Sequence, residues 1–300
     1  MRKLILLMAF VSGSSVVVAQ QLHFTSQYMQ HNPMYNPGAA GIAQKDLIGL
    51  SYRNMWSSFP GNPRTYMIYG DFDWEKMNAG IGTYIYRDET GPTSRTGIQL
   101  AYSYHVKMQN PNHRLGLGLE LRALQFAIDK NKISGSLGND PVLAGAENKL
   151  GIDAGAGVYF TTGKLAVGVA ASQLIQSKLQ LADVPNAKTG GKLYRHYNAT
   201  ASYRINTGAD IYLIPNAMVR VIENSPSEFE FGMQLDYQDK VWWGINWRIE
   251  QAWSLQAGFK IKKKIGLSYS YDYYQAPISI FTNGSGAHEL GLRFELGKSE

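Results

Sequence analysis

The sequence predicts an all-β protein, a transmembrane antiparallel β-barrel of about 14 strands, whose N-terminal segment is placed to plug the lumen. Three observations support this fold class. Apolar side chains recur at every second position beyond residue 45, which is the period of a strand. The alternating runs are close to the ~9–11 residues that a tilted strand needs to cross a bilayer. The connections between runs alternate between long and short, as in outer-membrane barrels.

Residues 1–19 are expected to be a signal peptide. Arg2 and Lys3 form a positively charged start, residues 4–11 are an apolar run, and Ala19 supplies a small residue before Gln20. The chain has no cysteine, which excludes disulfides, thiolate metal sites, cysteine nucleophiles and a lipid anchor. Without the two N-terminal cations the formal net charge falls from +6 to +4, and no basic stripe indicates nucleic-acid binding.

Residues 20–45 are expected to form a separate periplasmic or plug segment before the first strand. Two Asn-Pro pairs, at 32–33 and 36–37, are turn signals that impose a bent or extended path. The aromatic residues Phe24, Tyr28 and Tyr35 favour an ordered segment over a loose tail. Two interpretations remain open: the segment enters the lumen and occludes it, or it lies beneath the barrel as a docking surface.

Residues 46–300 are expected to form the barrel. The clearest alternation spans residues 115–121, where leucines occupy the odd positions and Gly116, Gly118 and Glu120 the even ones. The expected strands are 46–53, 64–73, 79–87, 94–106, 113–124, 150–161, 164–172, 193–204, 212–222, 228–237, 240–249, 252–262, 265–274 and 287–297.

Long connections follow the odd-numbered strands, and short turns follow the even-numbered ones. This arrangement is typical of a barrel with an even strand number and both termini in the periplasm. The longest loops, near residues 126–149 and 173–192, are therefore expected to be extracellular and, as loops on a rigid scaffold, to carry binding contacts.

The side-chain parity of the strands places charges of both signs on the inner wall. The candidate lumen network consists of Arg53, Asp71, Glu120, Arg122, Asp153, Asp236, Arg248, Asp272 and Arg293. A selective pore concentrates one sign of charge at its constriction, so mixed signs favour a packed, ion-paired lumen over an open polar pore.

No motif for catalysis or cofactor binding is present. Zinc-protease, phosphate-binding, dinucleotide-binding and serine-hydrolase motifs are all missing, and the six histidines lack the spacing of metal ligands. The neighbours His288 and Glu289 face opposite sides of a strand and cannot share a site. The sequence therefore favours a non-enzymatic protein without a cofactor or a metal.

Four stretches of the chain resemble one bacterial family. They are the segment FTSQYMQHNPMYNPGAAG, the hairpin WSSFPGNPRTY, the strand YRHYNATASYRI, and the C-terminal series VWWGINWR, GLSYSYDYY and GSGAHELGLRF. In their order and spacing the chain resembles the PorP/SprF family of Bacteroidota outer-membrane proteins of type IX secretion and gliding motility. The family's N-terminal motif falls on Tyr28, Asn32, Pro33, Asn36, Pro37 and Gly41. Gly38 stands where the family often has alanine, and only local flexibility is expected from this departure.

The resemblance implies an integral outer-membrane protein that binds or anchors exported surface proteins. The implied partners are outer-membrane lipid, a type IX secreted surface protein such as an adhesin or its C-terminal domain, and the periplasmic secretion or motility machinery. The alternative from another functional class is an outer-membrane channel or a hydrophobic-solute transporter with a similar number of strands.

Overall fold

The computed structural model describes residues 25–129, 148–178, 192–262 and 264–297. The expected signal peptide lies outside the described residues, as does most of the two longest loops. The strands are β1 (Asp46–Met55), β2 (Arg64–Trp74), β3 (Ala79–Thr90), β4 (Thr93–Val106), β5 (Arg114–Ile128), β6 (Asn148–Thr161), β7 (Leu165–Ser172), β8 (His196–Tyr203), β9 (Ile205–Gly208), β10 (Ile211–Ile222), β11 (Glu228–Tyr237), β12 (Val241–Arg248), β13 (Ala252–Ile261), β14 (Ile265–Tyr274) and β15 (Ala287–Leu296).

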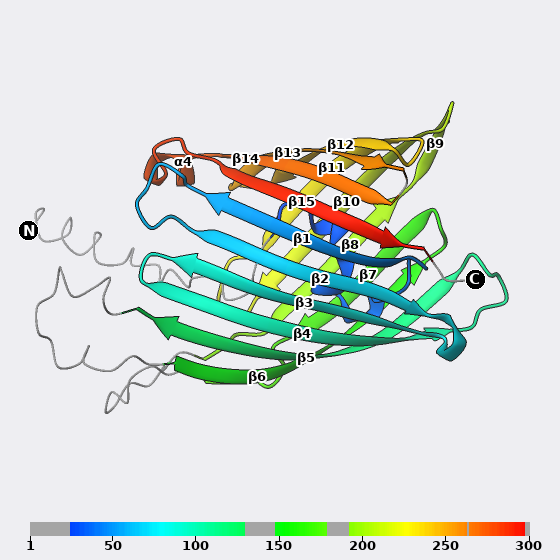
Figure 1. Cartoon of the computed structure of the whole chain (residues 1–300), viewed down its shortest axis with the longest axis horizontal. Helices are drawn as coiled ribbons and strands as arrows, with labels where there is room; N and C mark the ends of the chain where they lie inside the picture. Colours follow the sequence, from blue (N-terminus) through cyan, green and yellow to red (C-terminus); the bar gives the residue numbers. More distant parts are fainter. Residues whose placement is uncertain (1–24, 130–147, 179–191, 263, 298–300) are drawn as a thin grey trace, which may run out of the picture.

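These strands form one closed antiparallel barrel (Figure 1). β8 and β9 are two parts of one strand, interrupted at Arg204, and both pair with β10. The barrel closes because β1 pairs with β15 and β10 pairs with β11. The expected barrel of about 14 strands is confirmed.

The connections divide the barrel into two ends. When β8 and β9 are counted as one strand, each even-numbered strand of the barrel except the last is followed by a turn of two to seven residues. Examples are the two residues between β9 and β10 and the seven between β4 and β5. The opposite end, called here the long-loop end, carries connections such as the twelve residues between β14 and β15, which include the helix α4 (Ile278–Phe281). Figure 1 shows the barrel from the side, with α4 at the long-loop end.

The side chains of the wall sort by parity, with apolar groups outside and polar groups inside. On β5, Leu119 and Leu121 point outward and are 67% and 61% exposed, whereas Glu120 and Arg122 between them are buried. This reversal of the usual pattern suits an outer surface that faces hydrocarbon and a polar interior. Closing the sheet also leaves the wall without a free edge, which a bilayer requires. None of the described helices is long and apolar enough to span a membrane.

Candidate functional site in the barrel lumen

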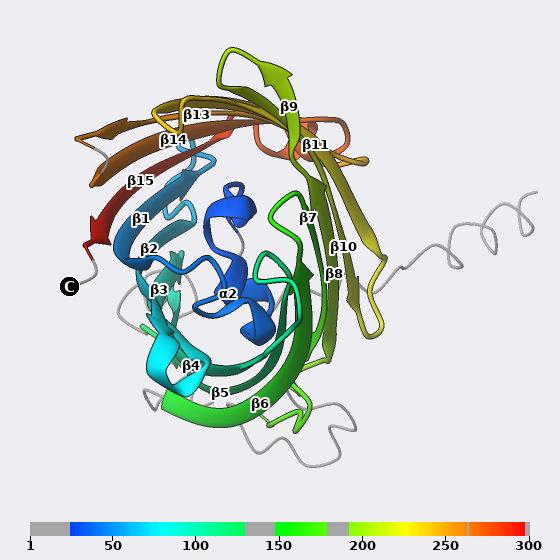
Figure 2. The same ribbon diagram turned by 90° about the vertical axis from the view of Figure 1, so that its right-hand side faces the viewer.

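Residues 25–42, called here the lumen segment, lie inside the barrel (Figure 2). They form three short helices, η1 (Tyr28–Gln30), α2 (Asn32–Tyr35) and η2 (Pro37–Ala39). The two Asn-Pro pairs set these turns: Pro33 lies in the first turn of α2 and Pro37 in the first turn of η2, where a missing N–H costs nothing. The lumen segment contains no acidic or basic residue other than His31. A neutral chain therefore lies in a charged interior.

The lumen segment begins near the long-loop end, against a buried ion network. Arg53 on β1 contacts Asp272 on β14 at 2.6 Å and Glu289 on β15 at 3.1 Å. The backbone N–H of Ser26 donates to Glu289 at 2.9 Å, and the Ser26 hydroxyl donates to Asp272 at 2.7 Å. Arg53 donates to the Ser26 oxygen at 2.7 Å, and the Thr25 hydroxyl donates to Glu289. The segment thus supplies neutral dipoles that complete the coordination of a buried charge cluster.

The network extends along the neighbouring strands. Arg248 on β12 lies 3.3 Å from Glu230 and 3.9 Å from Asp272, so it joins the carboxylates of β11 and β14. Buried carboxylates and guanidinium groups are costly to desolvate and persist only when each is paired and hydrogen-bonded. The ion pairs therefore hold the side chains of Arg248, Glu230 and Asp272 in fixed positions.

A second ion pair holds the middle of the lumen segment. Arg122 contacts its neighbour Glu120 on β5 at 2.7 Å. The same guanidinium donates to the Met34 carbonyl at 3.0 Å and to the Tyr84 hydroxyl at 2.7 Å. The Gln99 amide also donates to Glu120. The wall of β3, β4 and β5 is thereby bonded to the end of α2.

Backbone contacts hold the last part of the segment at the short-turn end. The side-chain amide of Asn36 donates to the backbone carbonyls of Val158 on β6 at 2.9 Å and Val169 on β7 at 3.2 Å. The Gly41 N–H donates to Asp71 at 2.6 Å on β2. The lumen segment therefore crosses the barrel from the long-loop end to the short-turn end, where β1 begins.

Glycines on the inner wall make room for these contacts. We call Gly80, Gly116, Gly118 and Gly157 the glycine trough. A Cβ atom at Gly118 would overlap the backbone of Pro37, and one at Gly80 would overlap Ala40. The even-numbered glycines of β5 are thus small because the lumen segment packs directly on the wall.

The sequence led us to expect that Gly38 adds local flexibility, but the structure shows a different role. A Cβ atom there would lie 2.8 Å from the Gly116 carbonyl oxygen and 2.9 Å from the Tyr159 nitrogen. Alanine at this position would require the wall to shift. Gly41 is constrained in another way, because its φ of 67° lies in the left-handed region that favours glycine.

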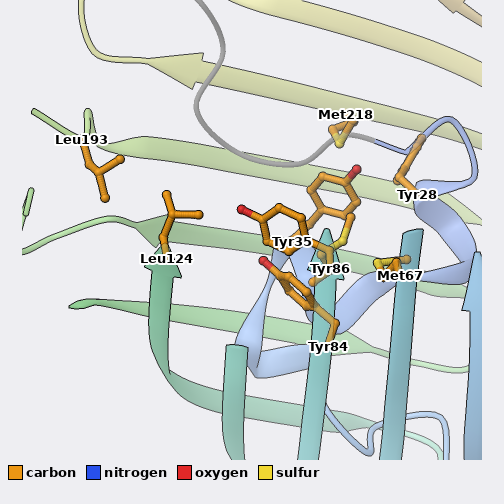
Figure 3. Close-up of a cluster of buried hydrophobic side chains, with 9 residues drawn as sticks. Tyr28, Tyr35, Met67, Tyr84, Tyr86, Leu124, Leu193 and Met218 are labelled. Atoms are coloured by element: carbon orange, nitrogen blue, oxygen red, sulfur yellow. The ribbon is translucent and has the colours of Figure 1, made fainter. Parts of the chain in front are cut away.

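Aromatic side chains fill the space around α2 (Figure 3). Tyr28 and Tyr35 of the lumen segment pack edge to face and join a buried cluster with Tyr84 and Tyr86 of β3. The Tyr28 hydroxyl donates to the Asn216 side chain at 2.7 Å. Burial raises the pKa of Tyr35 to about 12, so this hydroxyl stays neutral. The cluster gives the polar interior an apolar centre.

His31 is a neutral buried histidine. Burial lowers its pKa to about 3, and the charge of nearby Arg293 acts in the same direction. The ring meets the edge of Tyr69 at a centroid distance of 4.4 Å. Its Nδ1 atom has no hydrogen-bond partner among the described residues.

The structure brings most of the candidate lumen network into contact with the lumen segment. Arg53, Asp71, Arg122 and Arg293 bond to the segment directly, the last through Gln30 at 2.8 Å. Asp272 bonds to Ser26, while Glu120 and Arg248 act through their ion pairs.

Two residues of the candidate network do not contact the segment. Asp153 accepts the backbone N–H groups of Ile175 and Gln176 at 2.9 and 3.0 Å, so it holds the start of the β7–β8 loop. Asp236 accepts the N–H of Asp239 at 2.9 Å and closes a short turn. Parity identified these side chains as inward-facing, but their partners are loop backbones.

The residues of the N-terminal motif have separate roles. Tyr28 and Asn36 bond to the wall, and Pro33 packs over Gly82, where a Cβ atom would lie 2.8 Å from its ring. Pro37 packs over Gly118 and Gly41 binds Asp71, whereas Asn32 contributes its backbone carbonyl to α2. The roles of Thr25, Ser26 and the glycine trough were not predicted from the sequence. The glycine alternation of β5 was the visible signal for the trough.

No group of three metal-ligating side chains occurs in the part of the chain that the structure describes. The arrangement provides hydrogen bonds, ion pairs and close packing around a neutral peptide. Its chemistry is that of a bound internal segment.

Comparisons with solved structures agree with this fold. The toluene transporter TbuX from Ralstonia pickettii matches with a TM-score of 0.55 at 10% identity, over 88% of this chain and 93% of that chain. The toluene transporter TodX from P. putida matches with a TM-score of 0.50 at 8% identity, over the same shares of the two chains. At such low identity these similarities concern the fold alone. No curated protein matches the sequence significantly.

The family model of the type IX secretion system membrane protein PorP/SprF matches residues 17–294, which is nearly the whole chain. The resemblance found in the sequence motifs is therefore confirmed. The chain belongs to the PorP/SprF family of type IX secretion system membrane proteins, and with its closed, apolar-walled barrel it is an integral protein of the bacterial outer membrane.

Proposed function

We propose that this protein is a non-enzymatic scaffold of type IX secretion and gliding motility. Its long-loop end binds or anchors exported surface proteins such as adhesins, through the secreted protein or its C-terminal domain. Its short-turn end contacts the periplasmic secretion or motility machinery. Membership in the PorP/SprF family supports the secretion role.

The observation that carries this proposal is the occupied lumen. Thr25, Ser26, Gln27 and Tyr28 are each at most 2% exposed, and the first three bond to the β13–β15 and β1 wall. An open channel needs a continuous path through the lumen, and the buried internal peptide lies across that path. A scaffold gains a rigid barrel that can present its loops.

The decisive experiment removes the lumen segment. Deleting residues 20–37 while keeping the signal peptide should leave a folded, heat-modifiable barrel that conducts ions in a planar bilayer, whereas the intact protein shows no steady conductance. The measurement compares both proteins at the same salt and voltage. Two results together would identify the segment as a docking element and not an occluding one. The deletion variant would show no conductance in the bilayer, and cells that carry it would no longer display the client protein on their surface.

The alternative function is transport of a hydrophobic solute. It is favoured by the fold similarity to TbuX and TodX, which are toluene transporters. A large steady conductance of the intact protein, or uptake of an aromatic hydrocarbon that depends on the intact protein, would support this alternative. Normal surface display of client proteins in a strain that lacks the gene would count against the scaffold.

A further inference from the structure

An apolar groove of about 910 Å³ runs along the outside of the barrel, across the strands from β12 through β15 and β1 to β4. Its outward-facing lining includes Leu50, Ile68, Trp243, Phe259 and Leu290, each more than a third exposed. The volume lies in the range of ~300–1,000 Å³ that is typical of small-molecule sites. Of these strands, β13, β14, β15, β1, β2 and β3 are labelled one after another along one side of the barrel in Figure 2.

The groove lies behind a row of small side chains on the inner wall. Gly258, Ser268, Gly291 and Ser51 are register partners across β13, β14, β15 and β1. Small side chains let this part of the wall lie close to the lumen segment. Gln27 Oε1 is only 3.4 Å from the position of a Cβ atom at Gly291. The same packing that holds the lumen segment therefore draws the wall inward and leaves space outside.

The position and lining of the groove require a hydrocarbon occupant. It lies on the membrane-facing surface, and its leucine, isoleucine and aromatic lining offers water few partners. A methylene group is about as large as a water molecule, whose share of liquid volume is ~30 Å³, so the groove has room for roughly thirty such groups. That is the hydrocarbon of two acyl chains.

The rim at the long-loop end is basic. Arg87 lines the groove, and its side chain is 55% exposed. Arg64 is exposed on the neighbouring strand, two residues before Tyr66, which is the register partner of Arg87. Glu89 pairs with Arg87 at 2.7 Å. The three side chains of Arg64, Arg87 and Glu89 together carry a net charge of +1. Guanidinium groups match phosphate oxygens in geometry and charge, which makes this rim suited to an anionic head group.

We propose that the groove binds a phosphate-bearing acyl lipid of the outer leaflet. Its acyl chains lie along Leu50 and Leu290, and its phosphate contacts Arg87 and Arg64. The assignment to the outer leaflet rests on the long loops facing the cell exterior. The lipid site itself does not depend on the proposed secretion role.

Native mass spectrometry of protein extracted from outer membranes in mild detergent tests this site. The wild type should carry one phosphorylated lipid with at least two acyl chains. Leu290→Trp fills the groove and should reduce the fraction of protein with bound lipid at least tenfold. Leu119→Trp is the matched control, because Leu119 faces lipid on β5, away from the groove, and the bound fraction should not change. Heat modifiability shows that each variant is folded.

Two rim substitutions test the head group with opposite signs. Arg87→Gln should lower the bound fraction of phosphorylated lipid, and Glu89→Gln should raise it, because the first removes a cation and the second removes its competing anion. This pair decides the question even where Leu290→Trp does not fold. A wild type without bound lipid, equal lipid on both tryptophan variants, a co-purifying protein in place of lipid, or equal effects of the two rim substitutions would each overturn the proposal.

Discussion

Arg53 is the side chain on which the long-loop end of the lumen depends most. Arg53→Met leaves Glu289 without a guanidinium partner and Asp272 with only Arg248, 3.9 Å away. Removing one partner of a buried ion pair costs about 3–5 kcal/mol, because the remaining charge stays desolvated. We expect a loss of this size in the free energy of unfolding, measured with urea in lipid vesicles.

The control for this substitution is Lys45→Met. Lys45 and Asp239 are paired at 3.6 Å, but their side chains are 48% and 54% exposed. Exposed pairs contribute about 0–1 kcal/mol, so this variant should unfold almost like the wild type. Equal losses in the two variants would mean that the lumen is hydrated and that the network is weak.

His31 makes the binding of the lumen segment pH-dependent. Its pKa is about 3 in the buried state and near 6.5 when exposed, so the released segment binds the extra proton. Binding is therefore fully favourable above pH 6.5 and weakens as the pH falls towards 3, by about 2 kcal/mol at pH 5. The ring faces Tyr69 and the charge of Arg293, and neither accepts a proton in this range.

Conductance of the intact protein in planar bilayers measures this effect. Openings should become more frequent between pH 7 and pH 5 in the wild type, and His31→Gln should flatten the dependence. His113→Gln in the short β4–β5 turn is the control and should keep it. A pH response that His31→Gln leaves intact would assign the titration to another group.

Parity predicts which side chains face inward but not which partners they find. It placed Arg53, Asp71 and Asp272 on the inner wall, where they bond to the lumen segment. The same rule cannot separate them from Asp153 and Asp236, which hold loop backbones. The carboxylate partners of Thr25 and Ser26 lie more than 200 residues away in sequence on β14 and β15, so no local pattern indicates them.

At the scale of the element, the glycine trough makes β5 a docking surface. Gly118→Ala places a Cβ atom against the backbone of Pro37 and Gly38, which cannot move without leaving the wall. We expect this variant to fold but to release the end of the lumen segment, with faster proteolysis of residues 36–42. Gly244→Ala on β12 is the matched control, because its Cβ atom would meet no atom closer than 3.7 Å. Equal protection in both variants would mean that the contact adapts at low cost.

The two faces of β5 should respond to substitution through different mechanisms. Leu119→Arg places a charge in the hydrocarbon and should cost about 2–4 kcal/mol or block assembly. Glu120→Gln removes the buried partner of Arg122 and should destabilise the folded barrel without blocking insertion. Adding Arg122→Gln to Glu120→Gln should recover part of that loss, and a double-mutant cycle measures it. Additive losses from the two substitutions would show that the pair is not coupled.

The strands themselves could be predicted closely because each has one apolar and one polar face. β11 and β14 match the expected ranges at both ends, and from β10 onward the observed bounds differ from the expected ones by at most one residue. The eighth strand of the barrel, formed by β8 and β9, begins three residues later and ends four residues later than expected. The first half is longer than expected: β5 continues to Ile128 because pairing with β4 extends beyond the alternating apolar run. The break at Arg204 was not predicted from the alternation. It lies opposite the stretch of β10 that contains Pro215, which has no backbone N–H to donate to the neighbouring strand.

At the scale of the whole molecule, the path of the lumen segment differs from the expectation. With a periplasmic N-terminus, we expected a segment that begins at the short-turn end and either enters the lumen from there or lies beneath the barrel. In the structure Thr25 lies near the long-loop end, and the segment leaves the lumen at the short-turn end to start β1. Composition cannot indicate this direction, since it depends on where Ser26 finds Arg53, Asp272 and Glu289.

This path predicts where the chain upstream of Thr25 emerges. With the long loops facing outside, an epitope tag placed directly before Thr25, after signal-peptide cleavage, should be labelled by antibody on intact cells. A tag in the β1–β2 loop, at residues 56–63, should be labelled equally, because it lies at the same end. A tag between Gly163 and Lys164, in a short turn, should be labelled only after the outer membrane is opened. Labelling of the tag before Thr25 together with the short-turn tag would reverse the path, because the lumen segment would then have to enter from the periplasm.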